Sequence, residues 1–114
     1  MSIKRYPGKA FGRSKSVEHN GIVYTVVTAS DVSADLKGQT QQALEQLDAN
    51  LAEAGTDKSC LLSATIYITD MSKKPVLNAV WDAWIGSDNW PQRACVEVEL
   101  EGDTLVEMVV IAAK

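Results

Sequence analysis

The sequence has few of the residues that several classes of small protein need. It contains two cysteines, Cys60 and Cys95, and one histidine, His19, in 114 residues. Two cysteines cannot form a disulfide framework. Together with one histidine they also cannot complete a four-ligand zinc site unless carboxylates are added. We therefore expect a fold that is held by its hydrophobic core and has no structural metal.

Long apolar runs and an excess of basic residues are also missing. No stretch approaches the roughly 18 apolar residues of a membrane-spanning helix. The basic N-terminus is not followed by the apolar segment of a secretory signal. We expect a cytoplasmic protein with no membrane partner. The net charge is −4, so the chain lacks the positive field that attracts a phosphate backbone, and nucleic acid is not expected as a partner.

What is present is an ordinary globular composition, with 46% hydrophobic and 23% charged residues. A chain of this length and composition predicts one domain over residues 1–114. Residues 1–14 contain Pro7, Gly8 and Gly12, and are expected to form an extended N-terminal arm.

Hydrophobic periodicity predicts a ββαβαββ order. Asn20-Gly21 is a strong hairpin signal between two strands, because both residues tolerate the positive φ of a type I′ turn. Apolar residues at three- and four-residue spacing predict two helices, and alternation predicts the remaining strands. The expected strands are 16–19, 22–28, 61–69, 93–100 and 105–113, and the expected helices are 39–54 and 75–85. In strand 61–69, Leu62, Ala64, Ile66 and Ile68 are expected to share the apolar face.

This order favours a two-layer α+β domain, with one mostly antiparallel sheet and both helices on one face. Apolar residues remain for the other face of the sheet: Val26, Val96, Val98, Val109 and Ile111. An uncovered apolar face of this kind is usually buried in an oligomer.

Four segments of the second half carry a family resemblance. They are Thr65-Ile66-Tyr67-Ile68-Thr69-Asp70, Asn78-Ala79-Val80-Trp81-Asp82-Ala83-Trp84, Pro91-Gln92-Arg93-Ala94-Cys95-Val96, and Val106-Glu107-Met108 continuing to Ile111-Ala112. Residues 17–114 resemble the Rid (reactive intermediate deaminase) family, also called YjgF or L-PSP. The tryptophan-rich helix is closer to the YoaB-like branch than to RidA.

The resemblance implies a chorismate-mutase-like fold of the Bacillus type that assembles as a homotrimer, with ligand clefts between adjacent subunits. RidA-type members hydrolyse enamine and imine intermediates, such as 2-aminoacrylate, to 2-keto acids and ammonia. They need no metal or organic cofactor, so the resemblance implies none here.

The resemblance also assigns residues to a cleft. Arg93 stands at the position of the family's carboxylate-binding arginine, and a guanidinium offers a planar fork to a carboxylate. Cys95 and Asn78 stand at cleft positions, and Val26-Val27 replaces a Ser-Gly pair. The residue types alone also allow an ion-pairing Arg93, a packing Cys95 and a solvent-facing Asn78.

The last strand puts the family reaction in doubt. RidA-type deaminases carry two glutamates there, spaced by one residue, and the second positions or activates water. The first is retained as Glu107, but Val109 takes the place of the second, and valine moves no proton. Because alternate residues on a strand lie about 6.5 Å apart, Glu107 is only a weak catalytic candidate. The early tyrosine of the family falls near Arg13 or Ser14.

The sequence therefore predicts a homotrimer that binds a small carboxylate of the 2-imino or 2-keto acid type. Two versions stay open: an imine deaminase, and a non-catalytic metabolite sensor or protein-interaction module. An endoribonuclease has less support, because no basic stripe with interleaved aromatic residues is present. Trp81, Trp84 and Trp90 are expected either as core or interface anchors or as an aromatic wall.

Overall fold

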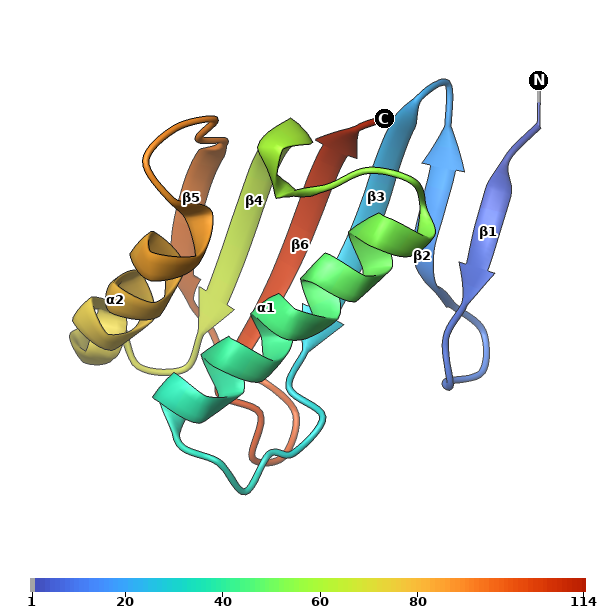
Figure 1. Cartoon of the computed structure of the whole chain (residues 1–114). Helices are drawn as coiled ribbons and strands as arrows, with labels where there is room; N and C mark the ends of the chain where they lie inside the picture. Colours follow the sequence, from blue (N-terminus) through green and yellow to red (C-terminus); the bar gives the residue numbers. More distant parts are fainter. Residues whose placement is uncertain (1) are drawn as a thin grey trace.

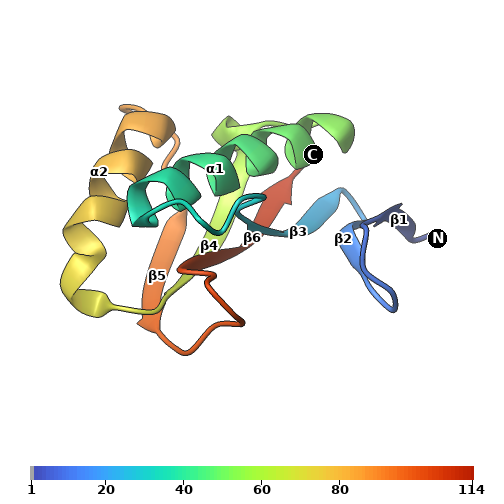
Figure 2. The ribbon, with the colours of Figure 1, turned by 90° about the horizontal axis from the view of Figure 1, so that it is seen from below.

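The computed structural model describes residues 2–114 and has two layers, a six-stranded sheet and two helices that cover one of its faces (Figures 1 and 2). The α+β class and the placement of both helices on one side are as predicted. The strands are β1 (Lys4–Pro7), β2 (Ser14–His19), β3 (Ile22–Thr28), β4 (Leu61–Ile68), β5 (Gln92–Glu97) and β6 (Val106–Ala113). The helices are α1 (Leu36–Glu53) and α2 (Lys74–Ile85), with short 3₁₀ turns at η1 (Lys58–Cys60) and η2 (Met71–Lys73).

The strand order across the sheet is β1-β2-β3-β6-β4-β5. All neighbouring strands are antiparallel except β4 and β5, which run parallel and are joined through α2. The sheet is therefore mostly antiparallel, as predicted. Its two edges are β1, in the N-terminal arm, and β5, which follows α2.

Several local predictions are confirmed. Asn20 and Gly21 have φ values of 53° and 75° and connect β2 to β3 with His19 paired to Ile22, as a type I′ hairpin requires. Gly55 follows the last residues of α1 with a φ of 83°, which is the left-handed conformation of a helix-ending glycine.

Three differences from the predicted elements exceed two residues. Helix α1 begins at Leu36, because Asp35 caps it by accepting a hydrogen bond from the Gly38 N–H at 2.9 Å. Strand β5 ends at Glu97 and does not reach residue 100. Residues 1–14 were predicted as an extended arm, and Lys4–Pro7 within it pairs with β2 as an additional strand.

The expected apolar face of β4 is wrong at its start. The pairing of β4 with β6 shifts register between Leu61 and Ser63, which is a bulge. Leu61 is therefore buried in the core at 6% exposure, whereas Leu62 is 47% exposed on the surface.

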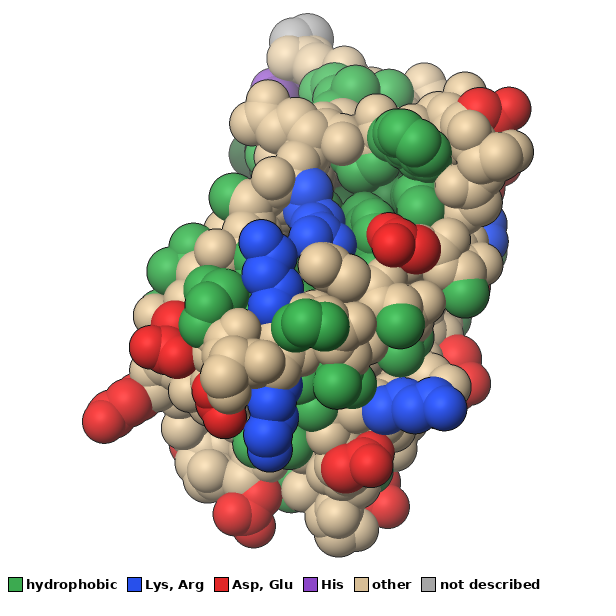
Figure 3. Space-filling view, turned by 90° about the vertical axis from the view of Figure 1, so that its left-hand side faces the viewer, with side chains coloured by type: hydrophobic (Ala, Val, Ile, Leu, Met, Phe, Trp, Pro, Cys, Tyr) green, Lys and Arg blue, Asp and Glu red, His purple; other side chains and the backbone are tan. Residues whose placement is uncertain are grey.

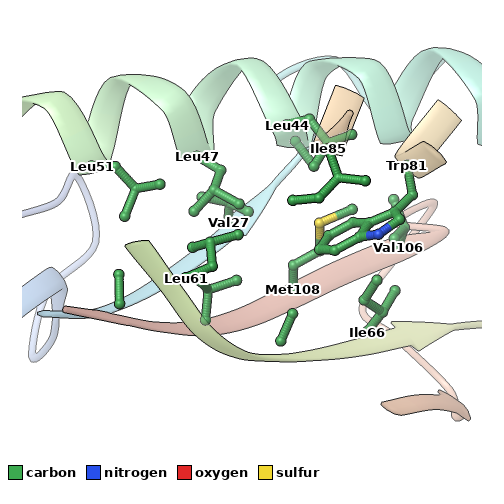
Figure 4. Packing of buried hydrophobic residues seen from close by; sticks show 14 of the residues in the cluster. Val27, Leu44, Leu47, Leu51, Leu61, Ile66, Trp81, Ile85, Val106 and Met108 are labelled. Atoms are coloured by element: carbon green, nitrogen blue, oxygen red, sulfur yellow. The ribbon is translucent and has the colours of Figure 1, made fainter. Parts of the chain in front are cut away.

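The core lies between the helices and the sheet (Figure 4). Leu44, Leu47 and Leu51 project from α1, and Trp81 and Ile85 from α2. They meet the inward side chains of the sheet, among them Val27, Ile66, Val106 and Met108.

Within residues 2–114, no layer covers the opposite face of the sheet (Figure 2). Tyr24, Val26, Val96 and Val109 are each 39–48% exposed there. Ile111 alternates with Val110 onto the same face and is partly exposed, while Val98 lies beyond the end of β5. The predicted uncovered apolar face is present. Among residues 2–114, no helix is long and apolar enough to cross a membrane.

Gln39 ties two distant loops together. Its side chain is fully buried, and its amide nitrogen donates to the carbonyl oxygens of Val32, Ala34 and Asp103 at 3.0–3.1 Å. Its amide oxygen accepts from the Leu105 N–H at 2.9 Å. The loop before α1 and the loop before β6 are thus held by one side chain.

The chain repeats one turn three times. In Asp31-x-Ser33, Asp57-x-Ser59 and Asp70-x-Ser72, the aspartate carboxylate accepts from the hydroxyl and the backbone N–H of the serine two residues later. The serine hydroxyl first, and the backbone N–H second, hold the pKa of each carboxyl below its ordinary value.

Replacing Gln39 by alanine is expected to lower the free energy of unfolding by about 2–3 kcal/mol, because buried backbone groups lose their partners. Urea denaturation of the variant measures this change. Gln41→Ala, an exposed glutamine on the same helix, is the control and should differ little from wild type. A Gln39→Ala protein as stable as the control would show that water replaces the amide without cost.

Acid should destabilise the protein through the three aspartates. A carboxyl whose pKa is lower in the folded state than in the unfolded state stabilises the fold at pH values above its unfolded-state pKa. This stabilisation is lost as the pH falls through the folded-state pKa. Between about pH 5 and pH 2.5 the unfolding free energy should therefore drop. Combined Asp31→Asn, Asp57→Asn and Asp70→Asn substitutions should flatten that drop, measured by denaturation at each pH. Glu45→Gln, Glu99→Gln and Glu101→Gln remove the same charge elsewhere, and an equal flattening by these would contradict the assignment.

Candidate functional site

Arg93 lies on the edge strand β5 and points to the helix-covered side of the sheet. Its register partner on β4 is Ala64, which is buried in the core. The guanidinium donates from Nη2 to Oδ1 of Asn78 at 2.6 Å and lies 5.4 Å from the ring centroid of Trp81. Both partners come from α2. A cation that lies over an aromatic face and also donates a hydrogen bond to a neighbouring side chain has a fixed orientation.

A hollow of about 530 Å³ opens beside this arginine. Its lining is Asn78, Trp81, Asp82 and Ile85 from α2, Gly86, Trp90 and Pro91 from the loop after it, and Arg93 itself. Figure 3 views the molecule from the side of α2 and β5, where hydrophobic side chains reach the surface next to basic and acidic ones. The hollow therefore combines one oriented cation with aromatic walls.

The guanidinium has donors to spare. Among residues 2–114, no carboxylate lies within ion-pairing distance of Arg93. No buried side-chain nitrogen or oxygen in that part of the chain lacks a partner, so the guanidinium donors that Asn78 does not use are accessible. An accessible, oriented guanidinium of this kind suits a planar carboxylate.

Cys95 and Asn78 lie as the strand and helix patterns predicted. Cys95 is half-buried on the same face of β5 as Arg93 and packs against the core, which is the packing alternative. Asn78 does not face solvent alone, because its Oδ1 accepts a hydrogen bond from Arg93.

Val26 and Val27 point in opposite directions. Val27 is 3% exposed in the core, whereas Val26 is 39% exposed on the uncovered face opposite Val109 of β6. Neither side chain lines the hollow beside Arg93. Within one chain the structure does not bring this pair together with the arginine.

Glu107 is also separated from Arg93. It lies on the uncovered face of the sheet, between Thr28 of β3 and Tyr67 of β4 in the register. Val109 follows on the same face, opposite Val26 and Thr65. Arg93 and Glu107 therefore occupy opposite faces of one sheet and cannot contact one ligand from within a single chain.

The arm does not reach the hollow either. Arg13 is exposed in the β1–β2 loop, where its guanidinium donates to the Phe11 carbonyl oxygen at 2.9 Å. Phe11 beside it is 98% exposed.

The three tryptophans have three different surroundings. Trp81 is a core residue at 5% exposure, and Trp84 donates from Nε1 to Asp48 on α1 at 3.0 Å. Trp90 is 70% exposed and lines the hollow beside Arg93. Its place in the lining corresponds to the aromatic-wall alternative of the sequence analysis. Asp82 and Ile85, which also line the hollow, were not predicted as part of a site.

A groove of about 1010 Å³ runs between α1 and α2, with Leu44, Val76, Val80 and Trp84 in its lining. Across residues 2–114, histidine, cysteine and acidic side chains do not gather in groups of three that could hold a metal ion. The hollow beside Arg93 is the site with an oriented charge.

Comparison with known proteins agrees with this fold along nearly the whole chain. The model of the family described as Endoribonuclease L-PSP matches residues 6–114. A RutC family protein from Haemophilus ducreyi is 40% identical over 97 residues, covering 83% of each chain. The RutC family protein YoaB from Escherichia coli is 35% identical over 114 residues, covering 99% of each chain.

Solved structures give the same result. A member of the YjgF protein family from Neisseria meningitidis superposes with a TM-score of 0.94 at 34% identity, covering 100% of this chain and 96% of that one. An uncharacterized protein from Pseudomonas aeruginosa gives a TM-score of 0.93 at 35% identity, covering 99% of both chains. Family match, sequence identity and fold agree, and the chain belongs to the Rid/YjgF/L-PSP family, with YoaB among its relatives.

Proposed function

We propose that the protein binds small carboxylate metabolites of the 2-keto or 2-imino acid type, with Arg93 holding the carboxylate. The observation that carries this proposal is the guanidinium itself, which is oriented by Asn78 and Trp81, accessible, and without an acidic partner in residues 2–114. A bidentate pair between a guanidinium and a carboxylate is both strong and directional. An arginine that only makes the surface polar would not need to be held by both Asn78 and Trp81.

The proposal includes a homotrimer with the sites between subunits. The uncovered sheet face offers Tyr24, Val26, Val96 and Val109 for burial against other copies. Arg93 and Glu107 lie on opposite faces of their own sheet, so a cleft that contains both must take them from two copies. In the trimer, a neighbouring copy would supply the residues that a single chain lacks on the open side of the hollow.

Two versions of the activity follow from the last strand. Hydrolysis of a 2-imino acid adds water across the C=N bond and releases a 2-keto acid and ammonia. That reaction needs a group that positions or deprotonates the water. Val109 offers only hydrocarbon on the strand face where Glu107 carries a carboxylate. The missing carboxylate at Val109 favours a second candidate function, in which the protein binds its ligand without turnover. In the deaminase version, Glu107 would be the acid or base.

The net charge of −4 argues against an endoribonuclease, although the family description contains that word.

Replacing Arg93 by alanine should weaken the binding of pyruvate at least about tenfold, because a charge-assisted bidentate contact is lost. Isothermal titration calorimetry on the purified protein measures the change. Arg5→Ala, on exposed strand β1, is the matched control and should bind as wild type does. Equal affinities for all three proteins would contradict the proposal.

Arg93→Ala and a further variant, Glu107→Gln, distinguish the deaminase from the recognition protein. A dehydratase that generates 2-aminoacrylate supplies the imine, and ammonia release is followed with and without this protein. A deaminase should accelerate the release in an Arg93-dependent manner and lose activity on Glu107→Gln. Binding without acceleration would identify a recognition protein.

The trimer is tested through the open face. Sedimentation should give a mass about three times the 12.4 kDa of the chain. Val109→Asp should dissociate it, because a buried unpaired charge is costly. Val76 on α2 is also 39% exposed, and Val76→Asp should leave the mass unchanged. A monomeric wild type would refute the assembly.

A further inference from the structure

We propose that the hollow beside Arg93 selects monocarboxylic keto or imino acids with a bulky apolar side chain, aromatic ones above all, and that Trp90 determines this preference. The inference rests on the proposed function, in which Arg93 binds the carboxylate, and specifies the substrate class of that site.

Trp90 does not belong to the hydrophobic core. Its ring is 70% exposed, outside the core, yet its indole Nε1 donates to the Gly86 carbonyl oxygen at 2.9 Å and fixes its position. The loop that carries it turns through two positive φ values, 84° at Gly86 and 60° at Asn89. An exposed aromatic ring held in place beside a cation is typical of a ligand-binding wall.

The lining of the hollow is apolar apart from three side chains. Ile85, Trp81 and Pro91 join Trp90 in the lining, and the guanidinium of Arg93 supplies its positive charge. Asn78 is already bonded to that guanidinium. Pockets of a few hundred Å³ hold molecules considerably larger than a three-carbon acid. With its carboxylate on Arg93, such an acid would leave most of the roughly 530 Å³ unfilled.

Asp82 gives the hollow a negative charge as well as a positive one. Its exposed side chain lines the same space. A second carboxylate on the ligand would be repelled by it, whereas an apolar group would not. The site is therefore selective for one negative charge and a hydrophobic remainder.

The test compares three probes, pyruvate, phenylpyruvate and 2-oxoglutarate, by isothermal titration calorimetry on the full chain. Wild type should bind phenylpyruvate roughly tenfold or more tightly than pyruvate, because a phenyl group leaves water. It should bind 2-oxoglutarate no better than pyruvate. Trp90→Ala should remove at least about fivefold of the phenylpyruvate affinity and leave pyruvate within about twofold. Trp90→Phe should restore most of the loss.

The outcomes separate this inference from the proposed function. If pyruvate binds through Arg93 but phenylpyruvate binds no better, the selectivity is refuted and the proposed function stands. If no acid binds, both fail together. Equal weakening of both acids by Trp90→Ala, or a changed oligomer mass, would make Trp90 a structural or interface residue and overturn the inference. A loss confined to phenylpyruvate supports it.

Discussion

The last strand of the chain, β6, lies between β3 and β4, and the two parts of the sheet are joined only through its hydrogen bonds. Its inward residues Val106, Met108, Val110 and Ala112 are all fully buried and form the middle stripe of the core. The helices therefore have no complete surface to cover until the final segment is in place. The Gln39 amide fixes the approach to that segment, because it holds Leu105, the residue directly before β6.

Elements with a strong local signal could be predicted from the sequence, and those that depend on pairing could not. The Asn20-Gly21 hairpin and the apolar stripes of both helices follow from residue type and spacing alone. The strand in the arm offers one inward side chain, Tyr6, which is too little for a pattern. Two adjacent leucines, Leu61 and Leu62, give no indication of which one a bulge turns inward. Whether β4 and β5 run parallel is decided by the crossover through α2.

The candidate site divides in the same way into positions that local spacing predicts and positions that depend on strand pairing. Arg93 and Cys95 share a face because they are two residues apart on one strand, and this much the spacing predicts. Whether Glu107 lies on that face depends on the register of three strands, through Tyr67 of β4 and Val96 of β5. The register puts Glu107 on the other side. A motif therefore identifies residues of a site without showing how many copies of the chain supply them.

Trp81 makes two kinds of contact that Trp90 does not make. Its ring is part of the core and also supports the cation of Arg93, so a change there would disturb packing and charge together. Trp90 lies in the mostly exposed loop Gly86–Pro91, and a different side chain at this one position would cost the fold little. Under the proposed function, a change in this one short loop would alter ligand preference and leave Arg93 and its supports on α2 in place. Within these 114 residues, the core residue that supports Arg93 and the loop that carries Trp90 are therefore separate parts of the structure.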